Sequence, residues 1–125
     1  MPTDVASLDF CYLTTTGRIT GKPHRIEIWF ALADQTVFLM AGDRDRSDWV
    51  RNLMITPDVE LELAGRKRAT RARAVDGSSE EDALARRLML EKYAGRDGGD
   101  LSTWGRTALV VAIEWPVSVS YTSLI

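Results

Sequence analysis

The sequence predicts one mainly β domain of the α+β class, with six antiparallel strands and two helices. Segments rich in aromatic and β-branched residues recur in pairs separated by short turns, one of them alternates cleanly in polarity, and only two segments have helical spacing. Strands grouped in hairpins are typical of an antiparallel barrel or an α+β sheet. The chain has 125 residues, 45% of them hydrophobic, which is enough for a single domain over 1–125.

The first three strands are predicted at residues 10–15, 25–32 and 36–41. The run FCYLTT has the composition of a strand and is followed at once by a glycine-rich turn. In the second segment the period is two, with Ile26, Ile28, Phe30 and Leu32 on one face and Arg25, Glu27, Trp29 and Ala31 on the other. Asp34 and Gln35 form a short polar break, so the second and third strands are expected to pair as a hairpin.

Two helices and three further strands complete the prediction. The first helix follows an N-cap at Ser47 and ends before Pro57, and the second follows Ser79 and closes near Gly95. Between them, 59–65 and 67–75 form a second hairpin around a turn at Gly65-Arg66. The last strand covers 107–114, and Pro116 disfavours a central strand in the tail 114–125.

The second hairpin carries the most conspicuous basic run, which comprises Arg66, Lys67, Arg68, Arg71 and Arg73. A turn at Gly65-Arg66 would place Glu60 opposite Arg71, and Asp58 opposite Arg73. Opposite charges across a strand pair are ordinary on a solvated sheet face. We therefore interpret this run as surface and expect no nucleic-acid partner.

The composition excludes several classes of function. The formal charge is -2, so no global field attracts a polyanion. Cys11 is the only cysteine and His24 the only histidine, which leaves no metal-ligand spacing and no internal disulfide. The longest apolar runs are too short to span a bilayer, and the start lacks the pattern of a signal peptide, so we expect a cytoplasmic protein without membrane insertion.

The turn after the first strand is basic without an acidic complement in its own sequence. It carries Arg18, Lys22, His24 and Arg25, with Glu27 as the nearest acid, and Gly17 and Gly21 permit close backbone approach. Such a turn suits a phosphate or carboxylate, although a generic basic loop has the same composition. A second candidate anion site follows the third strand, where Gly42, Arg44 and Arg46 precede a helix that carries Trp49 and Asn52.

These motifs resemble the deazaflavin-dependent nitroreductase and quinone reductase family. The similarity rests on TTTGRITGKPHR, on DRSDWVRNL followed by PDV, and on the terminal RTALVV strand, and it covers about residues 10–114. The resemblance implies a split β-barrel related to the FMN-binding fold, and an enzyme that uses reduced coenzyme F-420, an 8-hydroxy-5-deazaflavin. A hydride carried by such a coenzyme requires neither a protein nucleophile nor a metal.

The resemblance also implies roles for individual residues. It places Arg18, Lys22 and Arg25 near the phosphate and acidic tail of the coenzyme, and Trp49 and Asn52 beside its ring. Gly42, Arg44 and Arg46 would line it. The sequence departs from the family pattern at Glu27-Ile28, where proline-leucine is frequent, and at Asp43-Arg44, where a lysine is frequent. In the family, tyrosines that line the substrate side precede the last strand, whereas this chain has GGDLSTWGR there, with Trp104 and hydroxyls. The acceptor therefore does not transfer from the resemblance, and a quinone, a nitroaromatic compound and an enone all stay open.

Other assignments stay open at this level. Tyr12, Tyr93, Ser102 and Trp104 are candidates for the acceptor side of the site, the three hydroxyls as proton donors. FMN is the alternative cofactor, because a basic turn suits its single phosphate equally well. A non-catalytic binder of a small ligand, or a homodimer that buries the Trp29 face, would also account for the pattern.

Overall fold

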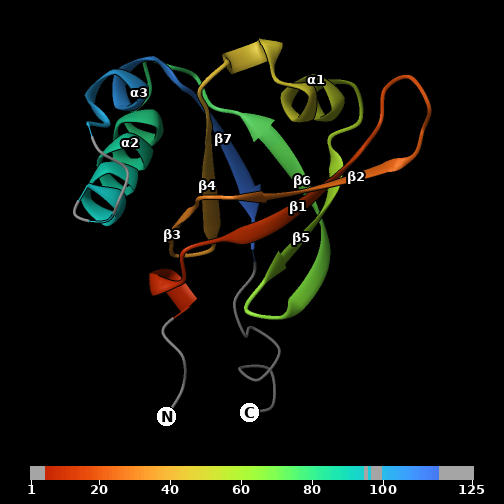
Figure 1. Cartoon of the computed structure of the whole chain (residues 1–125), viewed down its shortest axis with the longest axis horizontal. Coiled ribbons are helices and arrows are strands. Elements are labelled where there is room, and N and C mark those ends of the chain that lie inside the picture. The colour runs from red at the N-terminus through yellow and green to blue at the C-terminus, as the bar shows by residue number, and fades with distance from the viewer. Residues whose placement is uncertain (1–4, 95, 97–99, 116–125) are drawn as a thin grey trace.

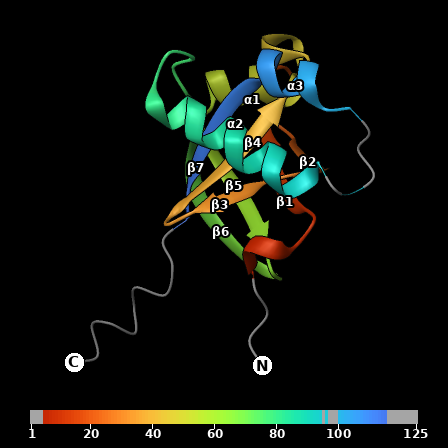
Figure 2. The ribbon, with the colours of Figure 1, turned by 90° about the vertical axis from the view of Figure 1, so that its left-hand side faces the viewer.

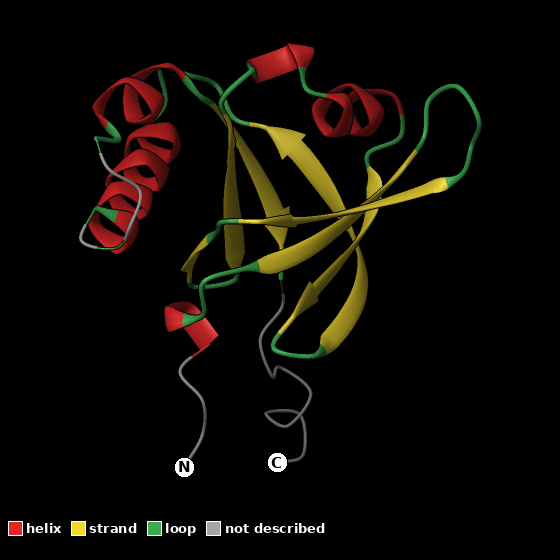
Figure 3. Cartoon of the chain, in the orientation of Figure 1, coloured by secondary structure: helices red, strands yellow, loops and turns green. Residues whose placement is uncertain are grey.

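The computed structural model describes residues 5–94, 96 and 100–115 and is mainly β (Figures 1 and 3). Within this part of the chain it has seven strands, three α-helices and two short 3-10 helices. The strands are β1 (Cys11–Thr16), β2 (Pro23–Ile28), β3 (Ala31–Ala33), β4 (Thr36–Ala41), β5 (Asp58–Leu63), β6 (Arg66–Ala74) and β7 (Leu109–Glu114).

All strands belong to one curled antiparallel sheet with the order β2-β1-β5-β6-β7-β4-β3. β2 and β3 lie at opposite ends of this order, although only Trp29 and Phe30 separate them in the chain. The chain therefore passes directly from one edge of the sheet to the other, and this passage curls the sheet into a split half-barrel (Figure 1).

The prediction of six strands was wrong in number because the segment 25–32 is divided. Phe30 and Ala31 are both buried although they are consecutive, so the alternation of a strand is lost at this point. The backbone N–H of Phe30 donates to the hydroxyl of Tyr93 at 3.0 Å, and its carbonyl accepts from Lys92 Nζ at 2.9 Å. Side chains of a helix thus satisfy backbone groups that a continuous strand would pair with a neighbour.

The register of the second hairpin also differs from the prediction. The turn is Ala64-Gly65, with φ of 56° and 79°, and not Gly65-Arg66. Two left-handed residues are the signature of a type I′ turn, whose twist matches that of the strands. Asp58 consequently lies opposite Arg71, with an ion pair at 3.5 Å, while Arg73 leaves this hairpin and pairs with Glu81 at 2.7 Å. Opposite charges therefore do face each other across this hairpin, but Asp58 faces Arg71 and not Arg73, so the register is shifted by two residues.

The helices lie at two places around the sheet. α1 (Asp48–Ile55) follows the 3-10 helix η2 (Arg44–Arg46) beside the β1–β2 turn, whereas α2 (Glu80–Tyr93) and α3 (Ser102–Thr107) cover the side formed by β3, β4 and β7 (Figures 1 and 2). The short helix η1 (Val5–Ser7) precedes β1. α3 was not predicted. No described helix is long and apolar enough to cross a bilayer.

The helix boundaries agree with the capping residues read from the sequence. Ser47 is the N-cap of α1, and the hydroxyl of Ser79 accepts a hydrogen bond from the backbone of Asp82 at 3.1 Å in α2. The last helical residue of α2 is Tyr93, and the predicted end at Gly95 lies outside the described residues. The predicted role of the tail 114–125 likewise falls almost entirely outside them.

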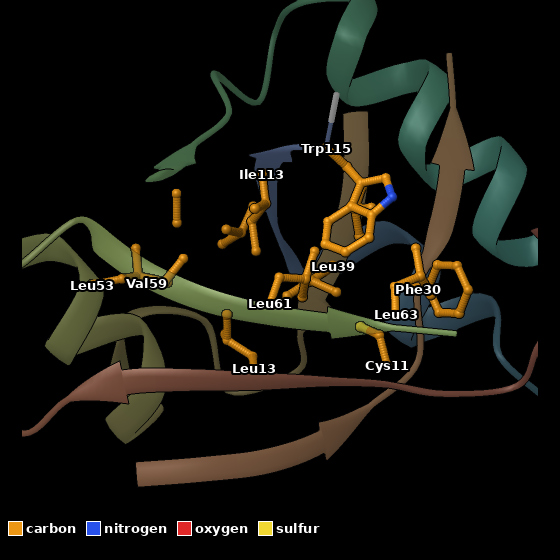
Figure 4. Close-up of a cluster of buried hydrophobic side chains, with 13 residues drawn as sticks. Cys11, Leu13, Phe30, Leu39, Leu53, Val59, Leu61, Leu63, Ile113 and Trp115 are labelled. Carbon is orange, nitrogen blue, oxygen red and sulfur yellow. The ribbon is translucent and has the colours of Figure 1, made fainter. Parts of the chain in front are cut away.

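The main core fills the inside of the curled sheet. Inward side chains from β1, β4, β5 and β7 meet the buried face of α1 there, among them Leu13, Leu39, Leu53, Leu61 and Ile113 (Figure 4). A second apolar cluster lies between β4, β7 and α2 and includes Phe38, Met89 and Tyr93. α1 is therefore anchored to the barrel core independently of α2 and α3.

Candidate functional site

A cavity of about 480 Å³ lies between the β1–β2 turn and α1. Figure 1 shows the turn reaching past the end of the sheet towards this helix. The volume lies within the range of small-molecule and cofactor sites, about 300–1,000 Å³. The lining residues come from β1, the turn, β2 and α1, and they are Thr15, Gly17, Arg18, Ile19, Thr20, His24, Arg25, Ile26, Asp48, Trp49 and Asn52.

The helix wall of the cavity is fixed by the core. Val50 and Leu53 of α1 are buried on the inner side of this helix. The partly buried Trp49 packs against the main core cluster, to which Leu53 belongs, and also lines the cavity. The indole is therefore shared between packing and the site. An aromatic wall held in this way offers a flat apolar surface to a planar ligand.

The turn opposite α1 is compact. Its ends are joined by a hydrogen bond from Gly17 N to the carbonyl of Lys22 at 2.8 Å, and a second runs from Gly21 N to the carbonyl of Gly17 at 2.8 Å. A Cβ on Gly17 would lie 2.6 Å from Nε2 of His24, so only glycine lets the imidazole cross the backbone here. The cavity wall at this point depends on that close approach.

Arg18 is held on the cavity wall by side chains of α1. Its guanidinium donates to Oδ1 of Asn52 at 2.9 Å and to Asp48 at 3.1 Å, and its backbone N–H donates to the same Asn52 oxygen at 3.1 Å. The side chain of Arg18 is 22% exposed and that of Asp48 is 84% exposed. Arg18 thus presents a partly shielded positive charge at a cavity that water can reach.

Arg25 borders the cavity, but its guanidinium lies on the outer face of the sheet. It donates to Glu62 of β5 at 3.0 Å and lies 4.2 Å from the ring centre of Tyr12. The hydroxyl of Tyr12 in turn donates to Glu27 at 2.8 Å. This hydrogen bond raises the pKa of Tyr12, because it would be lost on ionisation beside a carboxylate.

The turn therefore has the acidic complement that its own sequence lacks. Arg18 pairs with Asp48 and Arg25 pairs with Glu62, so the reading of these two cations as uncompensated was wrong. The acids come from α1 and β5, which the fold brings to the turn from 30 and 37 residues away. Among the described residues no ion pair involves the exposed Lys22.

The strand-end loop does not line this cavity. Gly42 lies against the indole of Trp104, where a Cβ would be 3.5 Å from the ring, and Arg44 donates to the carbonyl of Thr107 at 2.6 Å. Arg46 is exposed on η2. Gly42 and Arg44 thus lie near α3, and a role for Gly42, Arg44 and Arg46 in coenzyme binding stays a prediction.

The four candidates for the acceptor side also lie outside the cavity. Tyr12 is on the outer sheet face, and Ser102 is exposed at the start of α3. Tyr93 is 1% exposed and stacks on Trp29, with the ring centres 4.2 Å apart. The ring of Trp104 is perpendicular to the same indole, with the ring centres 5.6 Å apart. Burial raises the pKa of Tyr93 to about 12, which keeps this hydroxyl protonated.

Sequence reasoning missed several residues of the cavity. Thr15, Ile19, Thr20 and Ile26 were not singled out, and His24 was noted in the basic run without a role. The only signal was the alternation along β2, which places His24 and Ile26 on the same face. Asp48 at the start of α1 was not expected in the site either, although its carboxylate faces Arg18.

The chemistry of this lining fits the coenzyme that the resemblance implies. Trp49, Ile19 and Ile26 supply apolar surface for a planar ring system, and Arg18 supplies a cation for a phosphate or carboxylate. The exposed Lys22 and His24 add basic groups at the same turn. Trp49, Arg18 and Asn52, predicted from two separate motifs, come together at this one cavity, with Arg25 at its border.

Comparisons of structure agree on the architecture. A chain described as an F420-H2-dependent reductase (FDR-A) superimposes with a TM-score of 0.70 at 20% identity, over 90% of this chain and 100% of that one. A chain described as an F420 reductase gives a TM-score of 0.59 at 17% identity, over 91% and 94% of the two chains. The haem storage protein HutZ from Vibrio cholerae gives 0.69 at 15% identity, over 85% and 80%. These likenesses establish the fold alone, since the same fold occurs with different cofactors.

The comparison of sequence with protein families is more specific. No curated protein matches the chain significantly. In contrast, the profile described as F420H(2)-dependent quinone reductase matches residues 3–114, which include both motifs of the cavity and all seven strands. This match makes the chain a deazaflavin-dependent reductase with F-420 as its coenzyme, and the chain belongs to the family of F420H(2)-dependent quinone reductases.

Proposed function

We propose that the protein transfers a hydride from reduced coenzyme F-420 to a small organic acceptor, and that the cavity between the β1–β2 turn and α1 is the coenzyme site. The observation that carries this proposal is the convergence of Arg18, Trp49 and Asn52, from two separate family motifs, on one cavity of about 480 Å³. A quinone is the acceptor class that the family description favours. Nitroaromatic compounds and enones are the other candidates.

The coenzyme, when bound, supplies the hydride, and the chain supplies binding, orientation and exclusion of water. Trp49 offers a flat wall for the ring, and Ile19 and Ile26 extend its apolar surface. Arg18 offers a cation for the phosphate or the acidic tail, and Lys22 and Arg25 border the same region from the turn and from β2. The hydroxyls and imidazole in the lining belong to Thr15, Thr20 and His24.

Turnover tests this proposal. Purified protein is mixed with reduced F-420 and with menadione, a nitroaromatic compound or an enone, and the absorbance of the reoxidised coenzyme is followed. We expect saturable turnover with at least one acceptor. When reduced FMN replaces reduced F-420, we expect no rate above the protein-free background, which is subtracted because free reduced FMN reduces quinones by itself. Turnover with reduced FMN alone, or with neither coenzyme, would contradict the proposed function.

A matched pair of variants assigns the site. Replacing Arg18 and Lys22 by Ala removes two positive charges of the β1–β2 turn, of which Arg18 lines the cavity. Replacing Arg66 and Lys67 by Ala removes two exposed charges at the β5–β6 turn. We expect the first variant to bind oxidised F-420 at least about ten-fold more weakly, because charged hydrogen bonds contribute about 1.5–3 kcal/mol each. The second should bind like the wild type. Equal loss in both would show that only net charge matters.

A further inference from the structure

Arg18 has two partners on α1 that differ sharply in their surroundings. Asn52 is 3% exposed, and its Oδ1 accepts from both the backbone N–H and the guanidinium of Arg18. Asp48 is 84% exposed and accepts from the other terminal nitrogen, NH2, at 3.1 Å. The first partner is shielded from water, and the second is in competition with it.

Asn52 is itself fixed in orientation. Its Nδ2 donates to Oγ1 of Thr15 at 3.1 Å, and Thr15 is 1% exposed on β1. The amide therefore uses its oxygen towards the turn and its nitrogen towards the sheet. A flipped amide would lose both bonds to Arg18, because an NH2 group cannot accept from the guanidinium or the backbone N–H. One buried side chain thus ties α1, β1 and the basic turn together.

The contact with Asp48 is of a different kind. A carboxylate that is mostly exposed contributes little to an ion pair, because water and salt screen the attraction. A phosphate or carboxylate of a ligand in the cavity would offer Arg18 the same oxygen chemistry. The bond to Asn52 can persist when this exchange takes place, because it uses a different nitrogen of the guanidinium.

We propose that Asn52 is a positioning residue that holds Arg18 on the cavity wall, and that the anionic group of the bound ligand takes the place of Asp48. This inference rests on the proposed function, since it takes coenzyme F-420 as the ligand. It changes the role of Asn52 from a group beside the coenzyme ring to one that acts through Arg18. The exchange makes Asp48 an internal competitor of the ligand.

A double-mutant cycle tests the positioning role. The dissociation constant of oxidised F-420 is measured by calorimetry for the wild type, Arg18→Ala, Asn52→Ala and the double variant, below the thermal transition of each. We expect Arg18→Ala to weaken binding about ten- to a hundred-fold, and Asn52→Ala to weaken it nearly as much. In the Arg18→Ala background, Asn52→Ala should have almost no further effect.

A merely structural role predicts a different cycle. Asn52→Ala would then weaken binding by the same factor in both backgrounds, and this additivity would overturn the inference. Should Asn52→Ala fail to fold, Thr15→Val removes only the partner of Nδ2 and nearly keeps the shape of the side chain. We expect Thr15→Val to weaken binding severalfold with Arg18 present and not with Arg18→Ala.

Asp48→Asn tests the exchange. Removal of the competing carboxylate should tighten F-420 binding severalfold at low salt and less at high salt. The matched control is Asp45→Asn, since Asp45 is exposed on η2 and does not line the cavity. Unchanged or weaker binding by Asp48→Asn would overturn the exchange. Failure of the wild type to bind F-420 would overturn the proposed function and this inference together, whereas an additive cycle with intact wild-type binding overturns the inference alone.

Discussion

Gly17 has little room for a side chain in the cavity wall. A Cβ at this position would meet Nε2 and Cδ2 of His24 at 2.6 and 2.9 Å, and the carbonyl of Lys22 at 3.1 Å. The exposed imidazole can move aside, whereas the carbonyl of Lys22 belongs to the backbone of the turn and can give only slightly. The family motif around this turn therefore has a steric reason as well as an electrostatic one.

We expect Gly17→Ala to lower the free energy of unfolding by about 1 kcal/mol, the low end of the range for overpacking because the exposed His24 can move, and to weaken F-420 binding. Urea unfolding provides the measurement. Gly77→Ala is the control, because a Cβ there would meet open space, and its effect should stay within about 0.5 kcal/mol. Adding His24→Ala to Gly17→Ala should restore most of the loss. Equal stability of the two alanine variants would contradict the close approach.

The sequence located the cavity residues better than it explained them. Arg18, Trp49 and Asn52 were expected at the site on the strength of motifs, and all three line the cavity. Their partners could not be predicted, because Asp48 and Glu62 reach the turn only through the fold of α1 and β5. The acidic partners of such a turn therefore have to be sought in the whole fold and not in the sequence of the turn alone.

Among the secondary-structure elements, α3 depends on one buried ion pair of α2. Asp82 is 3% exposed and accepts from Arg86 Nε at 2.6 Å, and Arg86 also donates to the carbonyls of Gly105 and Ala108 at 3.0 and 2.7 Å. Arg86 thus joins α2 to the end of α3 and to the start of β7. The carbonyls at the end of a helix need such donors.

We expect Arg86→Ala to lower the free energy of unfolding by about 3–5 kcal/mol, because it leaves a buried carboxylate and two carbonyls without their donor. Arg87→Ala is the control, since this neighbour is exposed on the same helix and should change stability by less than about 0.5 kcal/mol. Urea unfolding followed by circular dichroism measures both. A small effect of Arg86→Ala would mean that water replaces the guanidinium.

The elements that were predicted correctly have clear local signals, namely helical spacing after an N-cap in α1 and a short apolar run after a polar break in β4. β4 and α1 have the residues that the sequence indicated, 36–41 and 48–55. The break between β2 and β3 was invisible, because residues 28–33 (IWFALA) form one apolar run without a turn residue. Its cause lies in Tyr93 and Lys92 of α2. α3 has only six residues and includes a glycine, which is too little for a helical period to appear.

For the whole molecule, the curled sheet encloses an ionisable group that the proposed chemistry does not use. Cys11 is fully buried, and burial raises the pKa of its thiol from 9.0 to about 12. In the unfolded chain the thiol ionises near its ordinary value, so above pH 9 the unfolded state binds fewer protons than the folded state. Stability contributed in this way is complete below pH 9 and is lost as the pH rises towards 12.

We therefore expect the free energy of unfolding to fall between pH 7 and pH 10, and to fall less in Cys11→Ala. The free energy of unfolding should fall by about 1.4 kcal/mol more in the wild type than in Cys11→Ala. This value follows because pH 10 lies one unit above the ordinary thiol pKa of 9.0, and one unit corresponds to about 1.4 kcal/mol. Urea unfolding of both proteins at the two pH values gives this number, whatever the cost of the substitution itself. An equal drop in both would show that Cys11 does not carry the effect.

The barrel also explains why two motifs far apart in sequence make one site. The chain leaves β1, turns back as β2, crosses the sheet at Trp29 and Phe30, and returns through β4 to place α1 beside the first turn. α1 is fixed there by the barrel core and by the bonds of Asn52 to the turn and to β1. The position of the cavity is thus a property of the fold, and its charge is a property of a few side chains.

The most direct test of the account is a crystal structure of the protein with oxidised F-420. The account predicts density for the ring beside Trp49 and an anionic group of the coenzyme within hydrogen-bond distance of Arg18, with Asn52 still bound to Arg18. Coenzyme density elsewhere on the molecule, with the cavity between the β1–β2 turn and α1 holding only solvent, would contradict it.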